Sequence, residues 1–136
     1  MKLLQKIALG ISGVTALGIG TFILAAPNAF YASYGIMPGS DPSLLSELRA
    51  PGAGLAVLGA IMLTGMFREA LLQTAIIAAL TVFLAFPAGR VVSMVADGMP
   101  SSGIVGALVL ELAIAALCLI AFRPASRREL PGSVAN

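Results

Sequence analysis

Histidine and tryptophan are absent from this sequence, and cysteine occurs once, as Cys118. Zinc sites, haem sites with histidine ligands, iron–sulfur clusters and Cys–His nucleophile pairs all need residues that the chain lacks. We therefore expect no metal site. Any redox role would fall to a bound organic molecule or to a partner protein.

Charged residues are also scarce, because they make up 10% of the 136 residues, whereas a soluble domain is about one-quarter charged. The net charge is +2, and the basic residues are spread along the chain. A nucleic-acid-binding protein gathers its basic residues in a stripe or patch, so we expect no nucleic-acid partner. Hydrophobic residues reach 59%, which is typical of a membrane protein.

Long apolar runs occupy most of the chain. A helix crosses the apolar core of a bilayer, about 30 Å thick, with about 20 residues. Four runs approach this length, at 7–26, 52–67, 70–86 and 103–122. The second run extends back to Asp41 and Pro42, which suit the N-cap and the first helical position. The third extends past Pro87 toward Ala96, with a kink allowed at the proline.

The sequence therefore predicts an all-α integral membrane protein, a four-helix bundle with short loops, as a single domain over residues 1–122. The spans are expected at about 7–26, 42–67, 70–96 and 103–122. Lys2 and Lys6 give the first run the basic start of a signal peptide, but its apolar stretch of about 18 residues exceeds the usual signal-peptide core. We interpret this run as a retained helix.

The basic residues predict the orientation of the bundle. With four spans, both termini lie on the same side as the loop that contains Arg68. That side holds six basic residues: Lys2, Lys6, Arg68, Arg123, Arg127 and Arg128. The opposite side holds two, Arg49 and Arg90. Both termini, including the polar tail at 123–136, are therefore predicted to be cytoplasmic.

Small residues recur at helical spacing and predict where the helices approach one another closely. On the first span they are Ala8, Ser12, Ala16 and Gly20. On the second they are Gly52, Ala56 and Ala60, and on the third Ala75 and Ala79. An alanine-rich composition also produces single pairs by chance, so the series of four on the first span is the main basis of this prediction.

We interpret two pairs of polar residues, two tyrosines and two serines, as structural. Tyr31 and Tyr34 fall near the outer membrane interface, where tyrosines are common, and we interpret them as interface anchors. Ser101 and Ser102 precede the last apolar run and are expected to cap its helix.

Glu111 lies inside the last apolar run, in GALVLELAIAALCL. Its position is about 12 Å along the helix axis from Gly103. A charge near the centre of a bilayer costs about 2.5–3.5 kcal/mol, so the side chain should face the bundle and either have a partner or be protonated. Arg90 is the best candidate partner, because its guanidinium stays charged and can meet a carboxylate with two parallel hydrogen bonds.

Three further charges lie in the same half of the predicted bundle, namely Glu47, Arg49 and Asp97. Together with Arg90 and Glu111 they predict a polar pocket that opens toward the outer side and has an apolar floor. One interpretation is an internal ion-pair network that fixes helix packing. The other is a site for an anionic or zwitterionic headgroup, a quinone-like ring or a proton.

These observations favour a non-catalytic binding protein for a membrane lipid or a quinone-like amphiphile, with no other cofactor evident. An accessory or scaffold subunit of a larger membrane complex, or a homo-oligomer, is the alternative. A proton or ion path through Glu111 is a third hypothesis, although four short spans leave little room for alternating access. An enzyme is disfavoured, because no nucleophile–base–orienter arrangement is present in the sequence.

The order of four features supports a family resemblance: SYGI, SELRAPGAG, GRVVSMVADGMPS and an apolar helix with an embedded glutamate. From about Lys6 to Phe122, the chain resembles small bacterial four-helix membrane proteins that form a domain of unknown function with a DoxX-like fold. Pro51 and Ala53 stand where an aromatic residue and a glycine would be expected. The resemblance implies the four-helix fold and a bacterial inner (plasma) membrane. It also draws attention to the same five residues: Glu47, Arg49, Arg90, Asp97 and Glu111.

Overall fold

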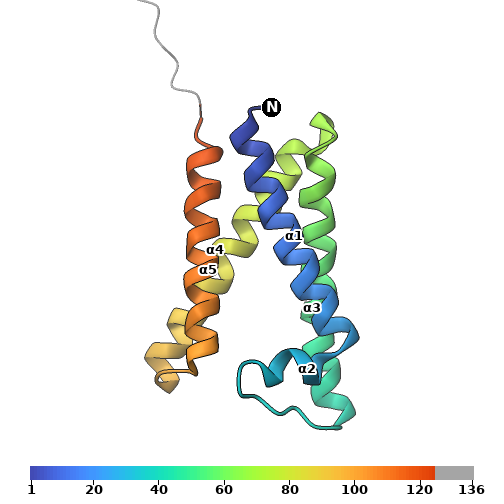
Figure 1. The fold of residues 1–136 in the computed structure, drawn as a ribbon, viewed down its shortest axis with the longest axis vertical. Helices are drawn as coiled ribbons and strands as arrows, with labels where there is room; N and C mark the ends of the chain where they lie inside the picture. The colour runs from blue at the N-terminus through green and yellow to red at the C-terminus, as the bar shows by residue number, and fades with distance from the viewer. Residues whose placement is uncertain (125–136) are drawn as a thin grey trace, which may run out of the picture.

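A computed structural model describes residues 1–124, and these residues form an all-helical bundle (Figure 1). Its long helices are α1 (Leu3–Ala25), α3 (Pro42–Gly65), α4 (Leu72–Asp97) and α5 (Ser102–Ala121). The short helix α2 (Pro27–Ala32) and the 3-10 helix η1 (Glu69–Leu71) lie in the connections. Most of the predicted polar tail, from residue 125 onward, lies outside the described residues.

Four segments of the described chain are long and apolar enough to cross a membrane: Leu3–Ala25, Pro42–Gly65, Glu69–Asp97 and Ser102–Ala121. They correspond to the four spans that the apolar runs predict. The all-α class is confirmed, and the composition and length of the helices are those of a small multi-pass membrane protein.

The start of α3 follows its local sequence signals, whereas the start of α5 is an exception. Asp41 caps α3, since its carboxylate accepts hydrogen bonds from the N–H groups of Ser43 and Leu44 at 3.3 and 3.4 Å, and Pro42 takes the first helical position. The exception is Ser101, which holds the N-cap position of α5 without capping it. Its hydroxyl instead donates to the carbonyl of Tyr34 at 2.8 Å. That bond ties the start of α5 to the segment after α2.

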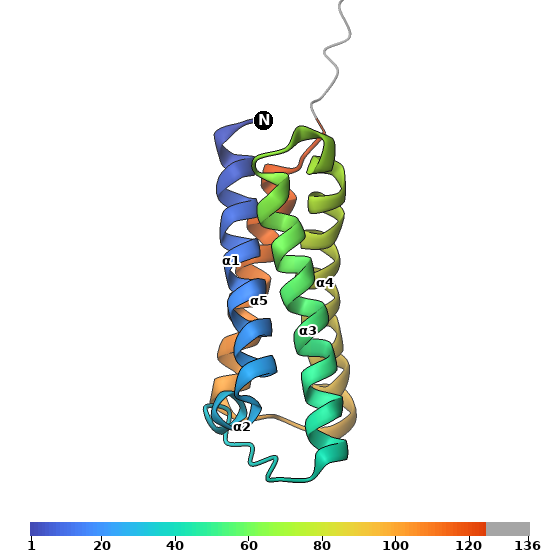
Figure 2. The ribbon, with the colours of Figure 1, turned by 90° about the vertical axis from the view of Figure 1, so that its right-hand side faces the viewer.

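The described ends of the chain lie together. The N terminus, η1 and the end of α5 are at one end of the bundle, and α2 is at the other (Figures 1 and 2). This arrangement is the one that four spans require. Helix α4 runs through Pro87 without interruption and ends at Asp97, and the next residue, Gly98, has a φ of +95° that is readily adopted only by glycine.

Glycines bring α1 and α3 into backbone contact. A Cβ atom on Gly20 would lie 2.5 Å from the carbonyl oxygen of Gly52, and a Cβ atom on Gly59 would lie 2.9 Å from that of Gly13. No side chain fits at such distances, so these positions require glycine. The small-residue series predicted on the first span is confirmed, because Ala8, Ser12, Ala16 and Gly20 are all buried.

For the series on the second span, the prediction that Ala60 contacts a neighbouring helix is wrong. Ala60 is exposed, and Gly59 makes the contact instead. At 3.6 residues per turn, seven residues return to within about 20° of the starting direction, whereas eight overshoot it by about 80°. Gly59 is seven residues after Gly52 and therefore stays on the face that α1 covers.

The tightly packed core lies in the half of the bundle that contains the N terminus. Leu9 and Met62 are fully buried there. Ser12 Oγ and Cys118 Sγ, also fully buried, form a hydrogen bond of 3.2 Å between α1 and α5. Toward α2, in contrast, α5 separates from α1 (Figure 1). The fold therefore has one closed half and one open half.

The α1–α3 contact generates a prediction about stability. Gly20→Ala should lower the free energy of unfolding by about 1–3 kcal/mol, because the added methyl group overpacks a backbone contact. Gly18→Ala on the same helix is the matched control, since a Cβ atom there meets nothing within 4 Å. Thermal unfolding in a mild detergent, followed by circular dichroism, measures both. Equal stability of the two variants would contradict the packing described here.

Candidate functional site

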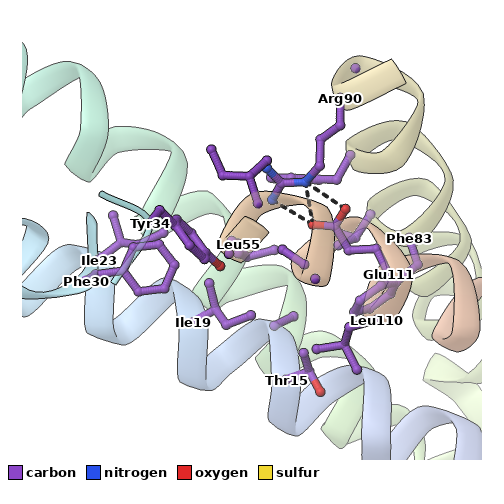
Figure 3. Close-up of a pocket in the computed structure, with 18 of the residues that line it drawn as sticks. Thr15, Ile19, Ile23, Phe30, Tyr34, Leu55, Phe83, Arg90, Leu110 and Glu111 are labelled. Atoms are coloured by element: carbon purple, nitrogen blue, oxygen red, sulfur yellow. Dashed lines mark hydrogen bonds and ion pairs between the residues drawn. The ribbon is translucent and has the colours of Figure 1, made fainter. Parts of the chain in front are cut away.

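A cavity of about 820 Å³ occupies the open half of the bundle. Its walls come from α1, α4 and α5 and from the segment around α2, and α3 contributes one residue, Leu55 (Figure 3). Most of the lining is apolar, for example Ile19, Leu55 and Phe83. The polar lining residues are Thr15, Tyr31, Tyr34, Arg90, Ser93 and Glu111. The volume lies within the range of about 300–1,000 Å³ that small-molecule sites span, and their lining is likewise mostly apolar with a few polar groups.

Arg90 of α4 and Glu111 of α5 form an ion pair in the cavity wall (Figure 3). Arg90 Nη2 donates to Glu111 Oε1 at 2.8 Å, and Nε donates to Oε2 at 2.9 Å and to Oε1 at 3.1 Å. The side chains are 26% and 14% exposed, respectively. This is the bidentate pairing that the sequence led us to expect, and it compensates both charges inside an apolar bundle.

The ion pair leaves part of the guanidinium available. Arginine carries five N–H groups, and the bonds to Glu111 use those on Nε and one on Nη2. Nη1 donates no hydrogen bond to the described residues, yet it is not a buried unsatisfied atom. Because Arg90 lines the cavity, we conclude that Nη1 is accessible to a molecule bound there.

Aromatic side chains form the wall opposite Arg90 (Figure 3). The ring centroid of Phe30 lies 5.1 Å from that of Tyr31 and 5.2 Å from that of Tyr34, with the rings nearly perpendicular. These distances and angles are those of favourable edge-to-face contacts. Burial raises the pKa of the Tyr31 phenol above its usual value and nearby Tyr34 raises it further, whereas the positive charge of Arg90 lowers it.

The part that the tyrosines play in the cavity was not predicted, because the sequence led us to interpret Tyr31 and Tyr34 as interface anchors. Both line the cavity. A spacing of three residues places them on one face of a helical turn, and that signal was available in the sequence. The direction of that face was not, because it depends on the bond from Ser101 to the Tyr34 carbonyl.

The structure does not bring Glu47, Arg49 and Asp97 to the ion pair. Glu47 and Arg49 are exposed, and Arg49 Nη1 donates to the carbonyl of Leu24 at 3.1 Å, which is in the last turn of α1. Asp97 is exposed and accepts a hydrogen bond from Ser93 Oγ at 3.1 Å. None of the three lines the cavity, so the charged site is smaller than the five-residue cluster that the sequence predicts.

The α1–α3 contact explains where Glu47 and Arg49 lie. It joins Gly20 to Gly52, so the part of α3 before Gly52 continues past the end of α1. The last carbonyls of a helix lack intrahelical donors, and Arg49 donates a hydrogen bond to one of them. Arg49 therefore has a structural role at the end of α1.

Within residues 1–124, no group of three or more acidic, cysteine or histidine side chains could hold a metal ion. The lining provides a hydrogen-bond donor on Arg90, two phenols and an extended apolar surface. Such a site can hold a molecule that is polar at one end and apolar over the rest.

Comparison with known families identifies a match. A family model described as "Domain of unknown function (DUF4345)" matches residues 4–122. The matched region includes nearly the whole of the four long helices. No curated protein and no solved structure matches the chain. The resemblance to an uncharacterised family is thereby confirmed.

The ion pair generates a prediction that a double-mutant cycle tests. Arg90→Met and Glu111→Met should each lower the free energy of unfolding by about 3 kcal/mol, because each leaves a charge without its partner. The double variant should recover most of this loss. Glu47→Met, at an exposed position, is the control and should change little. If the two single losses simply add in the double variant, the pair does not stabilise the fold.

Proposed function

The chain belongs to the DUF4345 family of domains of unknown function, and on that premise we propose that this small membrane protein binds a lipid or a quinone-like amphiphile. The binding site in this proposal is the cavity beside Arg90 and Glu111. The observation that carries the proposal is the combination, in one cavity, of extended apolar walls and an ion pair with a free donor.

The chemistry of the lining supports an amphiphile. An apolar tail would gain free energy by contact with Ile19, Leu55 and Phe83. A polar head would meet Nη1 of Arg90, which the bonds to Glu111 leave free. The site contains no arrangement of nucleophile and base, so a binding role suits it better than catalysis.

The alternatives have less support. An accessory subunit would use small-residue faces to contact partner helices, but Gly13 and Gly20 of α1 pack against α3 within the chain. A proton path would need a carboxylate free to exchange protons, whereas both oxygens of Glu111 accept hydrogen bonds from Arg90. A partner protein or a second copy of the chain therefore ranks below membrane lipid in this proposal.

The proposal includes a location. The multi-pass bundle is assigned to a bacterial inner membrane, with both termini in the cytoplasm and α2 toward the outer side. The numbers of basic residues near the two ends of the bundle support this orientation. The assignment to bacteria and the likeness to DoxX-type folds rest on the residue resemblance alone.

The binding proposal predicts that a specific amphiphile co-purifies with the protein. After extraction in a mild detergent, mass spectrometry of the bound lipids should find one species enriched in near-stoichiometric amount. Ala107→Phe should deplete this species at least fivefold, because Ala107 lines the cavity and a phenyl ring would fill it. Ala107→Phe leaves the ion pair in place, so loss of the bound species is not a consequence of an unpaired charge.

Ala113→Phe is the matched control for this experiment. Ala113 is on the same helix but exposed on its outer face, so the bound species should be retained. Circular dichroism would check that both variants are helical. If wild type and the Ala107→Phe variant carry the same lipid background, the cavity is not a binding site and the proposal fails.

The proposed orientation predicts the labelling pattern of engineered cysteines in intact cells. Ser40→Cys, in the exposed connection between α2 and α3, should react with a membrane-impermeant maleimide added outside. Lys2→Cys should react only after permeabilisation. Wild type is the control, because Cys118 is fully buried and bonded to Ser12. The reverse pattern would place the termini outside.

A further inference from the structure

The cavity is electrically balanced. Its lining contains one cation, Arg90, and one anion, Glu111, and these two side chains are bonded to each other. Asp97 is held by Ser93 and does not line the cavity, and Arg49 is bonded at the end of α1. A molecule that enters the cavity therefore meets no net charge.

An anionic head does not suit this balance. A phosphate or carboxylate would have to draw Arg90 away from Glu111, and the Glu111 side chain is only 14% exposed. An unpaired carboxylate at such a position is strongly disfavoured. If Arg90 kept both partners, one guanidinium would face two anions in an apolar surrounding, which is unfavourable for the same reason.

A cationic head does not suit it either. Both oxygens of Glu111 already accept hydrogen bonds from Arg90, so no acidic group of the lining is free. Tyr31 and Tyr34 offer aromatic faces that could attract a cation. However, the positive charge of Arg90 acts on Tyr31 across the cavity, and it would repel a second cation there.

We infer that the ligand of this cavity is an amphiphile whose head is uncharged and carries a hydrogen-bond-accepting oxygen. This inference rests on the proposed function and names the chemical class of its ligand. A carbonyl, ester or hydroxyl oxygen can accept from Arg90 Nη1 while Nε and Nη2 keep their bonds to Glu111. The ion pair then orients the donor and remains intact.

The tyrosine fluorescence of the chain can report binding in this cavity. It has two tyrosines and no tryptophan, and both tyrosines line the cavity. Intrinsic tyrosine emission therefore arises only from cavity residues. A ligand that enters the cavity should change this emission, and binding to the folded state should also raise the unfolding temperature.

The test compares probes that share a twelve-carbon chain and differ only in the head. The full-length protein, held in a non-ionic amphipol, is titrated with monolauroylglycerol, dodecyl phosphate, dodecyltrimethylammonium and dodecylphosphocholine. We expect monolauroylglycerol to give a saturable change in tyrosine emission, with a Kd at least tenfold lower than that of any charged or zwitterionic probe. Unfolding temperatures measured with the same probes should follow the same order.

The outcomes separate this inference from the proposed function. If dodecyl phosphate, dodecyltrimethylammonium or dodecylphosphocholine binds as tightly as monolauroylglycerol, the inference is overturned and the binding function stands. If no probe gives a saturable change in emission or unfolding temperature, the cavity does not accept amphiphiles, and both are overturned.

A charge variant supplies a second test. Glu111→Gln removes the anion and leaves Arg90 unpaired, so the preference should move at least tenfold toward dodecyl phosphate. Glu47→Gln removes an exposed carboxylate outside the cavity and should leave the preference unchanged. A folded Glu111→Gln variant with the wild-type preference would show that the head does not lie at the ion pair. If this variant fails to fold, the wild-type series still decides the question.

Discussion

Glu111 can occupy a membrane-length helix because Arg90 donates hydrogen bonds to both of its oxygens. Several features of the fold follow from this requirement. Helix α4 has to continue beyond Pro87 for Arg90 to be helical, and α5 has to turn Glu111 toward α4. The pair is then placed in the wall of the bundle, where it is both a structural contact and the polar part of a cavity. Its two roles are compatible because the guanidinium has more donors than the carboxylate uses.

The contrast between the two halves of the bundle has a simple physical origin. Near the N terminus, small residues let the helices approach closely, and the Ser12–Cys118 bond holds α1 to α5. In the other half, large side chains such as Phe83 and Phe30 stand between helices that have separated. Outside the closed half, close backbone contact is made by the α1–α3 pair and by Gly103 of α5 with Ser33, after α2. The remaining space is the cavity.

Much of this architecture could be predicted from the sequence, because the free energies that decide it depend on single residues or short segments. Apolar runs give the spans because a bilayer has a fixed thickness, and Asp41 with Pro42 gives the start of α3 because helix N-termini need an acceptor. The Arg90–Glu111 pair was predictable because an isolated charge inside the bundle is costly. The rotation of α3 was not, since it depends on whether Gly59 or Ala60 faces α1. The position of Glu47 and Arg49 was not predictable either, because it depends on how far α3 continues past the end of α1.

Pro87 has a mechanical consequence for the site. Proline has no backbone N–H, so the carbonyl of Phe83 lacks its usual helical donor. Helix α4 therefore has one backbone hydrogen bond fewer at the point between the closed and open halves. Bending at this point breaks no existing backbone bond. The segment that bears Arg90 is therefore more compliant than the segment that bears Ala75 and Ala79, which are fully buried. A change in the tilt of the part of α4 after Pro87 would change the width of the cavity, because Arg90 lines it, while Ala75 and Ala79 stay packed in the core.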